Sequence, residues 1–195
     1  KEIVKHANPT RDFNNIVLRM KSLNPDIVIP ANYYNEYALL LRTMQQQKVT
    51  PKAVYSVLGG AASSFKFVKE APESANGIID CNHWYNPKDA RALALRKRVE
   101  AKGLFFTYEI FNTYTAMMYL ADAINRAKST DRAAITAALT DSTFSDHFMP
   151  YGPTKMVNGQ NTGAQPLMTQ VLGGDIKVIV PREYRQADPV FPMKS

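Results

Sequence analysis

The chain has 195 residues, of which 45% are hydrophobic and 21% are charged, and this balance predicts a packed globular core rather than a disordered chain. Its formal charge of +7 comes from lysines and arginines scattered along the sequence, which favours solvated helix faces over a nucleic-acid-binding patch. The single cysteine, Cys81, excludes an intrachain disulfide and a cysteine zinc site.

The first residues, Lys1-Glu2-Ile3-Val4, resemble neither a signal peptide nor a natural start, and their pattern is typical of the interior of a strand. We therefore expect the chain to begin in the middle of a fold. No apolar run in the sequence reaches the ~20 residues that cross a bilayer.

Short β-branched runs alternate with helical patterns in the first part of the chain. Asp12 is expected to N-cap a helix over residues 13–23, which the pair Asn24-Pro25 ends. Residues 26–30 then predict a short buried strand. After a polar, aromatic loop a second helix follows, and its inward face is predicted to hold Tyr37, Leu40, Leu41 and Met44.

Two further strands are predicted at residues 53–57 and 77–81, joined by a glycine-rich turn and a helix. This β-α-β-α-β order with short connections predicts an α/β fold with a doubly wound parallel sheet. Ligands of such sheets bind at the carboxyl ends of the strands. Here those ends are the loops at residues 31–35, 58–61 and 82–86.

In the rest of the chain the predicted secondary structure changes twice, first to helices and then to strands. Three helices are predicted, over residues 89–102, 105–128 and 131–139. Strands return at 153–157 and 166–172, which a turn-rich segment over 158–163 joins. A Gly-Gly hairpin turn then leads to a strand over 176–180. This order predicts a chain that leaves one lobe, adds helices to another lobe and returns.

Several stretches, taken together in this order and spacing, match a known family over nearly the whole chain. They are Asp12-Phe13, Asn24-Pro25-Asp26-Ile27-Val28, Ala38-Leu39-Leu40-Leu41-Arg42, Glu73-Ser74-Ala75-Asn76-Gly77, Leu120-Ala121-Asp122-Ala123-Ile124, Tyr151-Gly152-Pro153-Thr154-Lys155, Asn158-Gly159-Gln160-Asn161 and Pro189-Val190-Phe191-Pro192. With them the chain resembles the C-terminal half of the leucine/isoleucine/valine-binding proteins, which are type I periplasmic solute-binding proteins of ABC importers.

The resemblance implies a type I periplasmic-binding-protein fold that is present in part. Residues 1–86 would belong to the C-terminal lobe, 87–147 would be helices of the N-terminal lobe, and 148–195 would return to the C-terminal lobe as strands and a tail. It implies a receptor outside the cytoplasm, in the periplasm or anchored to the membrane surface of a Gram-positive cell. The implied partners are a small-molecule solute, a membrane permease and the missing N-terminal half. Neither a cofactor nor nucleic acid is expected.

Tyr33 falls where the family places an aromatic residue against the ligand, and it follows the end of a predicted strand. A phenol offers flat apolar contact and one hydroxyl group. Its neighbours Asn32 and Tyr34 are further candidates. The alternative is that all three are ordinary loop residues.

Leu58, Gly59 and Gly60 occupy the next strand-end loop, where amino-acid receptors of the family carry an acid for the ligand's ammonium group. This loop has no acid. A buried ammonium without a carboxylate is costly, so an amino-acid-like ligand is disfavoured relative to a carboxylate or an aromatic compound. The two glycines let backbone amides approach a ligand, or they only form the turn.

Three other candidates lie further along the chain. Trp84 is expected either at the mouth of the cleft between the lobes or packed at a hinge. Tyr108 and Glu109 start the long helix, and the resemblance places Glu109 where a side chain faces the ligand. Glu109 would then replace the missing acid, or it would only stabilise the helix N-terminus.

An enzyme is not expected, because the sequence lacks a nucleophile elbow, a Walker loop, a dinucleotide fingerprint and a zinc-protease motif. Asp80 and His83 suggest a metal or acid–base pair, but no third ligand accompanies them, so a surface or hinge role is preferred. The alternative to a transport receptor is a ligand-sensing regulatory domain on the same fold.

Overall fold

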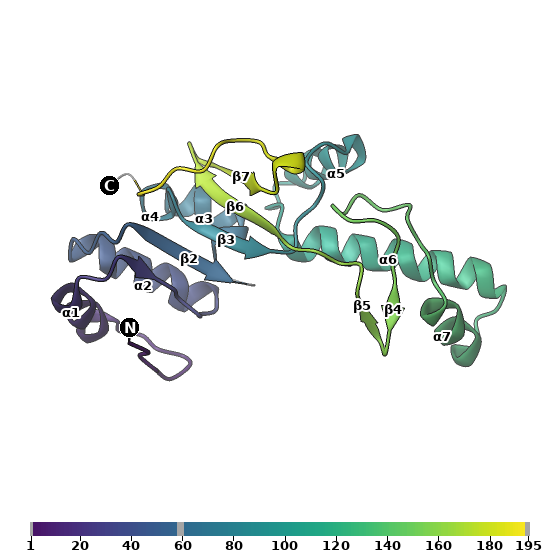
Figure 1. The fold of residues 1–195 in the computed structure, drawn as a ribbon, viewed down its shortest axis with the longest axis horizontal. Coiled ribbons are helices and arrows are strands. Elements are labelled where there is room, and N and C mark those ends of the chain that lie inside the picture. Colours follow the sequence, from purple (N-terminus) through teal and green to yellow (C-terminus); the bar gives the residue numbers. More distant parts are fainter. Residues whose placement is uncertain (1, 58–60, 194–195) are drawn as a thin grey trace. The chain divides into compact units, whose positions relative to one another are not determined.

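The structure is a computed structural model that describes residues 2–57 and 61–193. The chain divides into two compact units, each described here by itself (Figure 1). Unit 1 combines Lys1–Asn82 with Met168–Ser195, and unit 2 is His83–Leu167. These boundaries differ from the predicted ones at 86 and 147, since residues 148–167 group with the helices. The assignment of the segments to lobes of a larger protein stays a prediction.

A five-stranded sheet with the order β1-β2-β3-β6-β7 is the centre of unit 1. Its strands are β1 (Ile27–Val28), β2 (Ala53–Val57), β3 (Ile79–Asn82), β6 (Leu167–Leu172) and β7 (Asp175–Val180). β1, β2 and β3 are parallel, as the sequence predicts, whereas β6 and β7 form an antiparallel hairpin. Gly173 and Gly174 turn this hairpin with φ values of 59° and 77°, which glycine adopts without strain.

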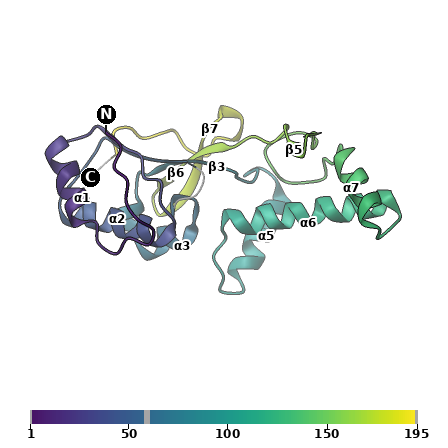
Figure 2. The ribbon, with the colours of Figure 1, turned by 90° about the horizontal axis from the view of Figure 1, so that it is seen from below.

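The helices of unit 1 are α1 (Asn14–Leu23), α2 (Tyr34–Gln46), η1 (Ala61–Ser63), α3 (Phe65–Glu70) and α4 (Pro72–Ala75). The strand order advances in one direction, so right-handed connections place α2 and α3 on the same face of the sheet. Figure 2 shows both helices below the strands. All four apolar residues predicted on the inward face of α2 are buried.

The C-terminal tail follows η2 (Arg182–Tyr184) and is tied to the sheet by Gln170 of β6. The Gln170 amide donates to the carbonyls of Gly77 (3.0 Å) and Val190 (2.8 Å) and accepts from the Val190 amide (2.9 Å). Further along, the Met193 amide donates to the Lys52 carbonyl at 2.8 Å. The tail is therefore part of unit 1 up to Met193.

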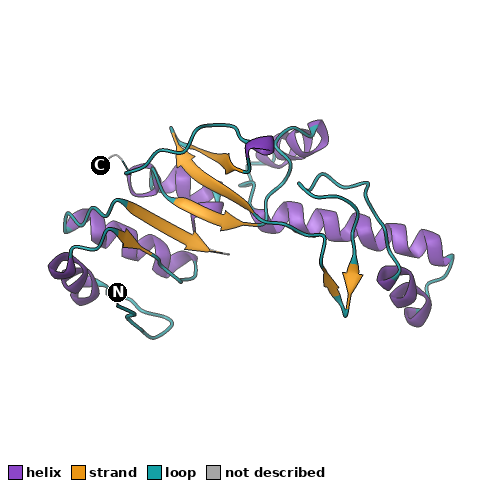
Figure 3. Ribbon diagram, viewed as in Figure 1, coloured by secondary structure: helices purple, strands orange, loops and turns teal. Residues whose placement is uncertain are grey.

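Unit 2 contains α5 (Ala90–Glu100), α6 (Tyr108–Ala127), α7 (Arg132–Thr140) and a short hairpin of β4 (Met156–Val157) and β5 (Gln160–Asn161). Figure 3 shows this predominance of helix. Asp89 and Asp131 cap α5 and α7 by accepting hydrogen bonds from backbone amides in the first turns. Of the strand predicted over residues 153–157, only Met156–Val157 forms a strand, and it pairs with β5, which lies inside the segment predicted as a turn.

Two details of the predicted helices differ from the structure. Phe13, not Asp12, is the N-cap residue of α1, although the Asp12 carboxylate still accepts a hydrogen bond from the Asn14 amide at 2.8 Å. Asn24 ends the helix in a left-handed conformation, and the preceding Leu23 is exposed. Only Val17 of α1 is fully buried, and it packs together with Phe13 just before the helix.

Candidate functional site

The carboxyl ends of β1 and β2 lie at one edge of the unit 1 sheet, because the two strands are parallel neighbours. This edge carries exposed apolar side chains: Ile29 and Tyr33 after β1, and Val57 at the end of β2. Tyr33 is 75% exposed and precedes α2, with extended backbone angles at the N-cap position. We call this region the carboxyl edge.

Asn32 is held in place by a residue from the N-terminal segment. Its side-chain amide donates to His6 Nε2 at 2.8 Å, while His6 Nδ1 lies 2.8 Å from the Ala7 carbonyl and 3.0 Å from the Thr10 hydroxyl. These contacts tie the Asn32 side chain to the N-terminal segment. This contact could not be predicted from the sequence, since His6 and Asn32 are 26 residues apart.

Tyr34 points toward α3 and differs in this from Tyr33. Its hydroxyl donates to Glu70 at 3.0 Å, its ring packs against Phe67, and Lys66 Nζ lies 5.1 Å from the ring centroid. Partial burial, together with the hydrogen bond to Glu70, raises the pKa of Tyr34 to about 12. These contacts favour a packing role for Tyr34. Leu58, Gly59 and Gly60 lie outside the described residues.

Trp84 has no exposed surface and belongs to the core of unit 2. Its ring stacks on Tyr85 and meets Phe111 edge-on, each with a centroid distance of 5.3 Å, and Phe106 completes the cluster. A buried indole cannot touch a ligand unless this cluster repacks. The expectation of a ligand contact at Trp84 is therefore corrected in favour of packing.

Tyr108 and Glu109 begin α6, as predicted, and Glu109 is exposed in its first turn. Glu109 borders a shallow hollow of about 470 Å³ along α6, together with Ile110, Thr113, Tyr114 and Met117. The hollow is mainly apolar, because Glu109 supplies its only charged group. The ligand role of Glu109 stays a prediction.

Asp80 is fully buried in β3, which contradicts the surface position among the two expected for it, and the hinge role stays a prediction. Its carboxylate accepts a hydrogen bond from the Ser63 hydroxyl of η1. Within residues 2–57 and 61–193, no group of three or more His, Cys, Asp or Glu side chains is arranged to hold a metal ion.

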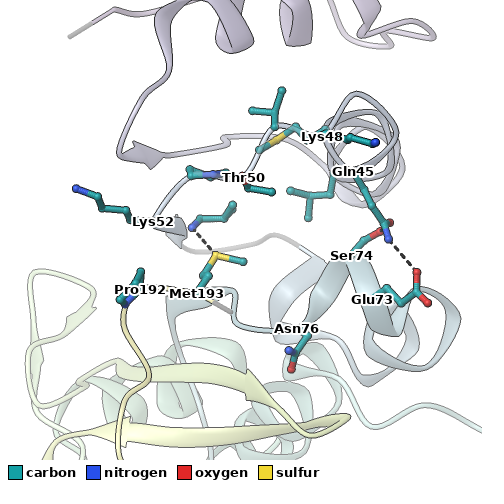
Figure 4. Close-up of a pocket in the computed structure, with 14 residues that line it drawn as sticks. Gln45, Lys48, Thr50, Lys52, Glu73, Ser74, Asn76, Pro192 and Met193 are labelled. Atoms are coloured by element: carbon teal, nitrogen blue, oxygen red, sulfur yellow. Dashed lines mark hydrogen bonds between the residues drawn. The ribbon is translucent and has the colours of Figure 1, made fainter. Parts of the chain in front are cut away.

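A cavity of about 690 Å³ opens at the opposite, amino edge of the same sheet (Figure 4). Met44, Val54 and Met193 form its apolar side. On its polar side Gln45 donates to Glu73 (2.9 Å) and accepts from Ser74 (2.6 Å), so these groups satisfy one another. This cavity could not be predicted from sequence patterns, because its walls come from three distant segments.

Comparison with protein-family models shows that residues 2–175 match the family described as "Periplasmic binding protein". The match covers most of the chain. The chain belongs to the periplasmic binding protein family. No sequence among the curated proteins matches this periplasmic binding protein.

Solved structures show the same fold. This periplasmic binding protein is similar to a leucine-binding protein from Thermotoga maritima, with 22% identity and a TM-score of 0.72 over 90% of this chain and 49% of that one. A putative branched-chain amino acid ABC transporter protein from Silicibacter pomeroyi has 18% identity and a TM-score of 0.71. The match covers 96% of this chain and 52% of that one. A branched-chain amino acid ABC transporter protein from Thermus thermophilus, with bound valine, has 15% identity and a TM-score of 0.70. The match covers 87% of this chain and 48% of that one.

The chain thus spans about half the length of the solved structures it matches. Its fold is the type I periplasmic-binding-protein fold, present in part, as expected from the sequence. None of the helices in the described part of the chain is both long and apolar enough to span a bilayer.

Proposed function

We propose that this periplasmic binding protein is the solute-binding receptor of an ABC importer and that it binds a small solute without changing it chemically. The family match over residues 2–175 carries the proposal. The transport role is supported by the similar structures described as ABC transporter proteins. A receptor of this kind works outside the cytoplasm, in the periplasm or attached to the cell surface, and passes its solute to a membrane permease.

The carboxyl edge of unit 1 would form one wall of the binding site. Exposed apolar and aromatic groups gather there, which is unfavourable in water and favourable against a ligand. Tyr33 is the main contact, since no other element covers most of its ring. Asn32, fixed by His6, offers an amide carbonyl at the same edge. The segment over residues 58–60 is a further candidate on sequence grounds.

The proposed ligand is an amino-acid-like, carboxylate or aromatic solute. The names of two similar proteins, which mention leucine and branched-chain amino acids, support the first class. The strand-end loop after β2 lacks an acid for an ammonium group, which supports the other two classes. Glu109 would supply the acid if the ligand carries an ammonium group.

The other wall is proposed to come from an N-terminal half that this chain lacks. The helix α6 supports this idea, because it is apolar on two opposite faces. One face holds the buried Phe111, Thr115 and Ala123, and the other holds a stripe of exposed and half-buried residues. The stripe consists of Ile110, Thr113, Met117, Leu120, Ala121 and Ile124. Met117 is 60% exposed there.

A ligand screen on the full-length protein tests the proposal. Melting temperatures are measured with L-leucine, L-valine, L-phenylalanine, succinate and benzoate, each over a concentration series. A receptor is stabilised by its ligand in proportion to RT ln(1 + [L]/Kd), so at least one probe raises the melting temperature. Stabilisation by amino acids alone contradicts the preference for carboxylates and aromatics, and turnover of a bound probe contradicts the receptor role.

The proposed contact is tested with Tyr33→Ala and with Phe191→Ala as a matched control, because both rings are largely exposed in this chain. Loss of a buried aromatic contact is expected to weaken ligand binding about tenfold or more, whereas the control binds as the wild type does. Equal affinities of Tyr33→Ala and wild type would remove Tyr33 from the site.

A further inference from the structure

The cavity of about 690 Å³ at the amino edge of the unit 1 sheet has the size of a ligand pocket, and we call it the amino-edge cavity (Figure 4). Its volume lies within the roughly 300–1,000 Å³ that small-molecule sites occupy in proteins. The end of α2, the loop that follows it, the start of β2, α4 and the tail all contribute to its lining. All of these segments belong to unit 1.

Met193 forms one wall of the cavity, and several contacts fix its position. Its amide donates to the Lys52 carbonyl at 2.8 Å, and its sulfur accepts from the Val54 amide at 3.1 Å. A Cβ atom at Gly77 would lie 3.2 Å from the Met193 Cγ, so the glycine leaves the room that this side chain needs. Contacts within unit 1 therefore hold the wall in place, as in binding pockets that are largely formed before a ligand enters.

The inner surface of the cavity is mainly apolar. Met44 and Val54 belong to the core and form its floor. Pro51, Pro192 and Met193 are more exposed and form an apolar rim. A hydrocarbon chain that covers this surface gains about threefold in affinity for each methylene group removed from water.

The polar groups that α4 contributes are already engaged. Glu73 accepts a hydrogen bond from the Gln45 amide, and the Gln45 carbonyl oxygen accepts one from the Ser74 hydroxyl. These three side chains thus form a chain of hydrogen bonds at one side of the cavity. A ligand gains little by competing for them.

The opposite situation holds for three other polar side chains of the lining. Lys48, Thr50 and Asn76 have side chains without a hydrogen-bond or ion-pair partner within residues 2–57 and 61–193. The ammonium group is a donor only, and the hydroxyl and amide groups can also donate. Lys52 adds a second positive charge, which it shares with Asp26 in an exposed ion pair at 2.7 Å. Donors and positive charge together are complementary to a carboxylate.

The Lys48 ammonium group is not needed to complete the end of α2. Lys48 lies just beyond the helix in a left-handed conformation (φ 57°), and the Val49 amide donates to the Met44 carbonyl at 2.9 Å. The ammonium group of Lys21 donates to the Gln47 carbonyl at 2.9 Å. Backbone groups and Lys21 thus satisfy carbonyls at this end, which leaves the charge of Lys48 for another acceptor.

We infer that the amino-edge cavity binds an aliphatic carboxylate of about eight to twelve carbons, with its chain against Met44, Val54 and Met193 and its carboxylate at Lys48. Glu73 repels a carboxylate at the α4 side, so the charged end of the ligand lies at the loop after α2. The cavity is at the opposite edge of the sheet from the carboxyl edge. This second site therefore goes beyond the proposed function and does not depend on it.

NMR of the full-length protein with ¹³C-labelled methionine methyl groups tests the site directly. Sodium decanoate is the probe, and it is titrated to millimolar concentration, below the point at which it forms micelles. We expect saturable binding that shifts the methyl signals of Met44 and Met193, whereas the signal of Met117 on α6 stays in place. Decylamine has a chain of the same length and the opposite charge, so it should bind about tenfold more weakly or less.

Two variants separate the charge of the site from its shape. Lys48→Gln should weaken decanoate binding about tenfold, because a hydrogen bond to a charged group is lost. Thr50→Trp places a large ring at an exposed position of the rim and should abolish binding. Lys128→Gln is the matched control and should bind as the wild type does. Lys128 also follows a helix in a left-handed conformation (φ 48°), but it does not line the cavity.

Chain length gives an independent check, since affinity should rise about threefold per methylene from hexanoate to octanoate to decanoate. Signals of Met44 and Met193 that do not move during the titration overturn the inference. Decanoate affinity that Thr50→Trp leaves unchanged overturns it too, because the probe then binds elsewhere. An unchanged affinity of Lys48→Gln, or equal affinities for decanoate and decylamine, contradicts the carboxylate as ligand. None of these measurements uses the solute of the proposed function, so they decide the inference even if that function fails.

Discussion

His147 is held at both ring nitrogens by the backbone of a single turn in unit 2. Nε2 donates to the Gly152 carbonyl (3.1 Å), and Nδ1 accepts from the Met149 amide (3.2 Å). The ring must therefore be neutral, with its proton on Nε2. Burial lowers the pKa of His147, and the charge of Arg91 adds to this, although the hydrogen bond to Gly152 opposes both.

This arrangement predicts acid sensitivity. The unfolded state takes up a proton at the ordinary histidine pKa, while the folded state resists it, so stability is lost as the pH falls from about 6.5 toward the lowered value. Melting curves should show wild type losing stability between pH 7 and pH 5. His147→Gln is expected to lose about 1–2 kcal/mol at pH 7 but to depend less on pH.

The contribution of His147 is measured as the difference between wild type and His147→Gln, because the buried Asp80 acts in the opposite direction. Burial raises the pKa of Asp80, so this residue favours the folded state at low pH, whereas His147 favours it at higher pH. A His147→Gln curve that stays parallel to wild type from pH 5 to pH 7 would show that His147 does not titrate in this range.

At the scale of the elements, the position of the C-terminal tail depends on one side chain of β6, Gln170. The tail has no strand of its own beyond η2 in the described residues, yet two hydrogen bonds between Gln170 and Val190 bind it to β6, and a third joins Gln170 to the Gly77 carbonyl. Met193 then packs against Gly77 and accepts from the Val54 amide through its sulfur. Contacts with the sheet order the tail.

Replacing Gln170 with leucine should therefore release the tail. The side chain keeps its approximate size, but the Val190 amide and two carbonyls lose their partner, which costs about 2–4 kcal/mol when such groups stay buried. Urea unfolding measures the loss. Gln46→Leu, at an exposed position of α2, is the matched control and should change stability by less than about 0.5 kcal/mol. Equal effects of both variants would contradict the role of Gln170.

At the scale of the whole molecule, the two units differ in how completely they are packed. Unit 1 has a sheet with buried helices and a continuous core. Unit 2 has several aromatic ring contacts, but α7 has no buried residue and α6 has only three. Apolar helices with so little burial are typical of a chain that packs against a partner.

The proposed N-terminal half predicts a difference between the complete protein and this chain. Met117→Lys places a charge in the stripe on α6, so it should destabilise the complete protein by about 3 kcal/mol. In the 195-residue chain the same change should cost less than about 0.5 kcal/mol, because Met117 is exposed there. Chemical unfolding of both forms measures this. Asn125→Lys, at an exposed position of the same helix, should be nearly neutral in both; an equal effect of Met117→Lys in the two forms would contradict a partner at this face.

Much of the fold could be predicted from the sequence, because hydrophobic periodicity is a local property. The alternation in residues 53–57 placed β2 correctly, and the helical spacing of Tyr37, Leu40, Leu41 and Met44 gave the buried face of α2. The parallel order of the first three strands followed from their helical connections. The family could be recognised from the order of short motifs. The site residues remain predictions, apart from Trp84, which is buried.

The tertiary structure decided which distant groups face one another. Asp80 looked like an isolated acid beside His83, and only the pairing of β2 with β3 and the position of η1 placed it against Ser63. From the sequence, Trp84 could lie at the mouth of the cleft or pack at a hinge, and only the structure shows it packed against Phe111. A local pattern shows which side of an element is apolar. What covers that side depends on segments far away in the sequence, which is why burial and side-chain pairing emerged only from the folded chain.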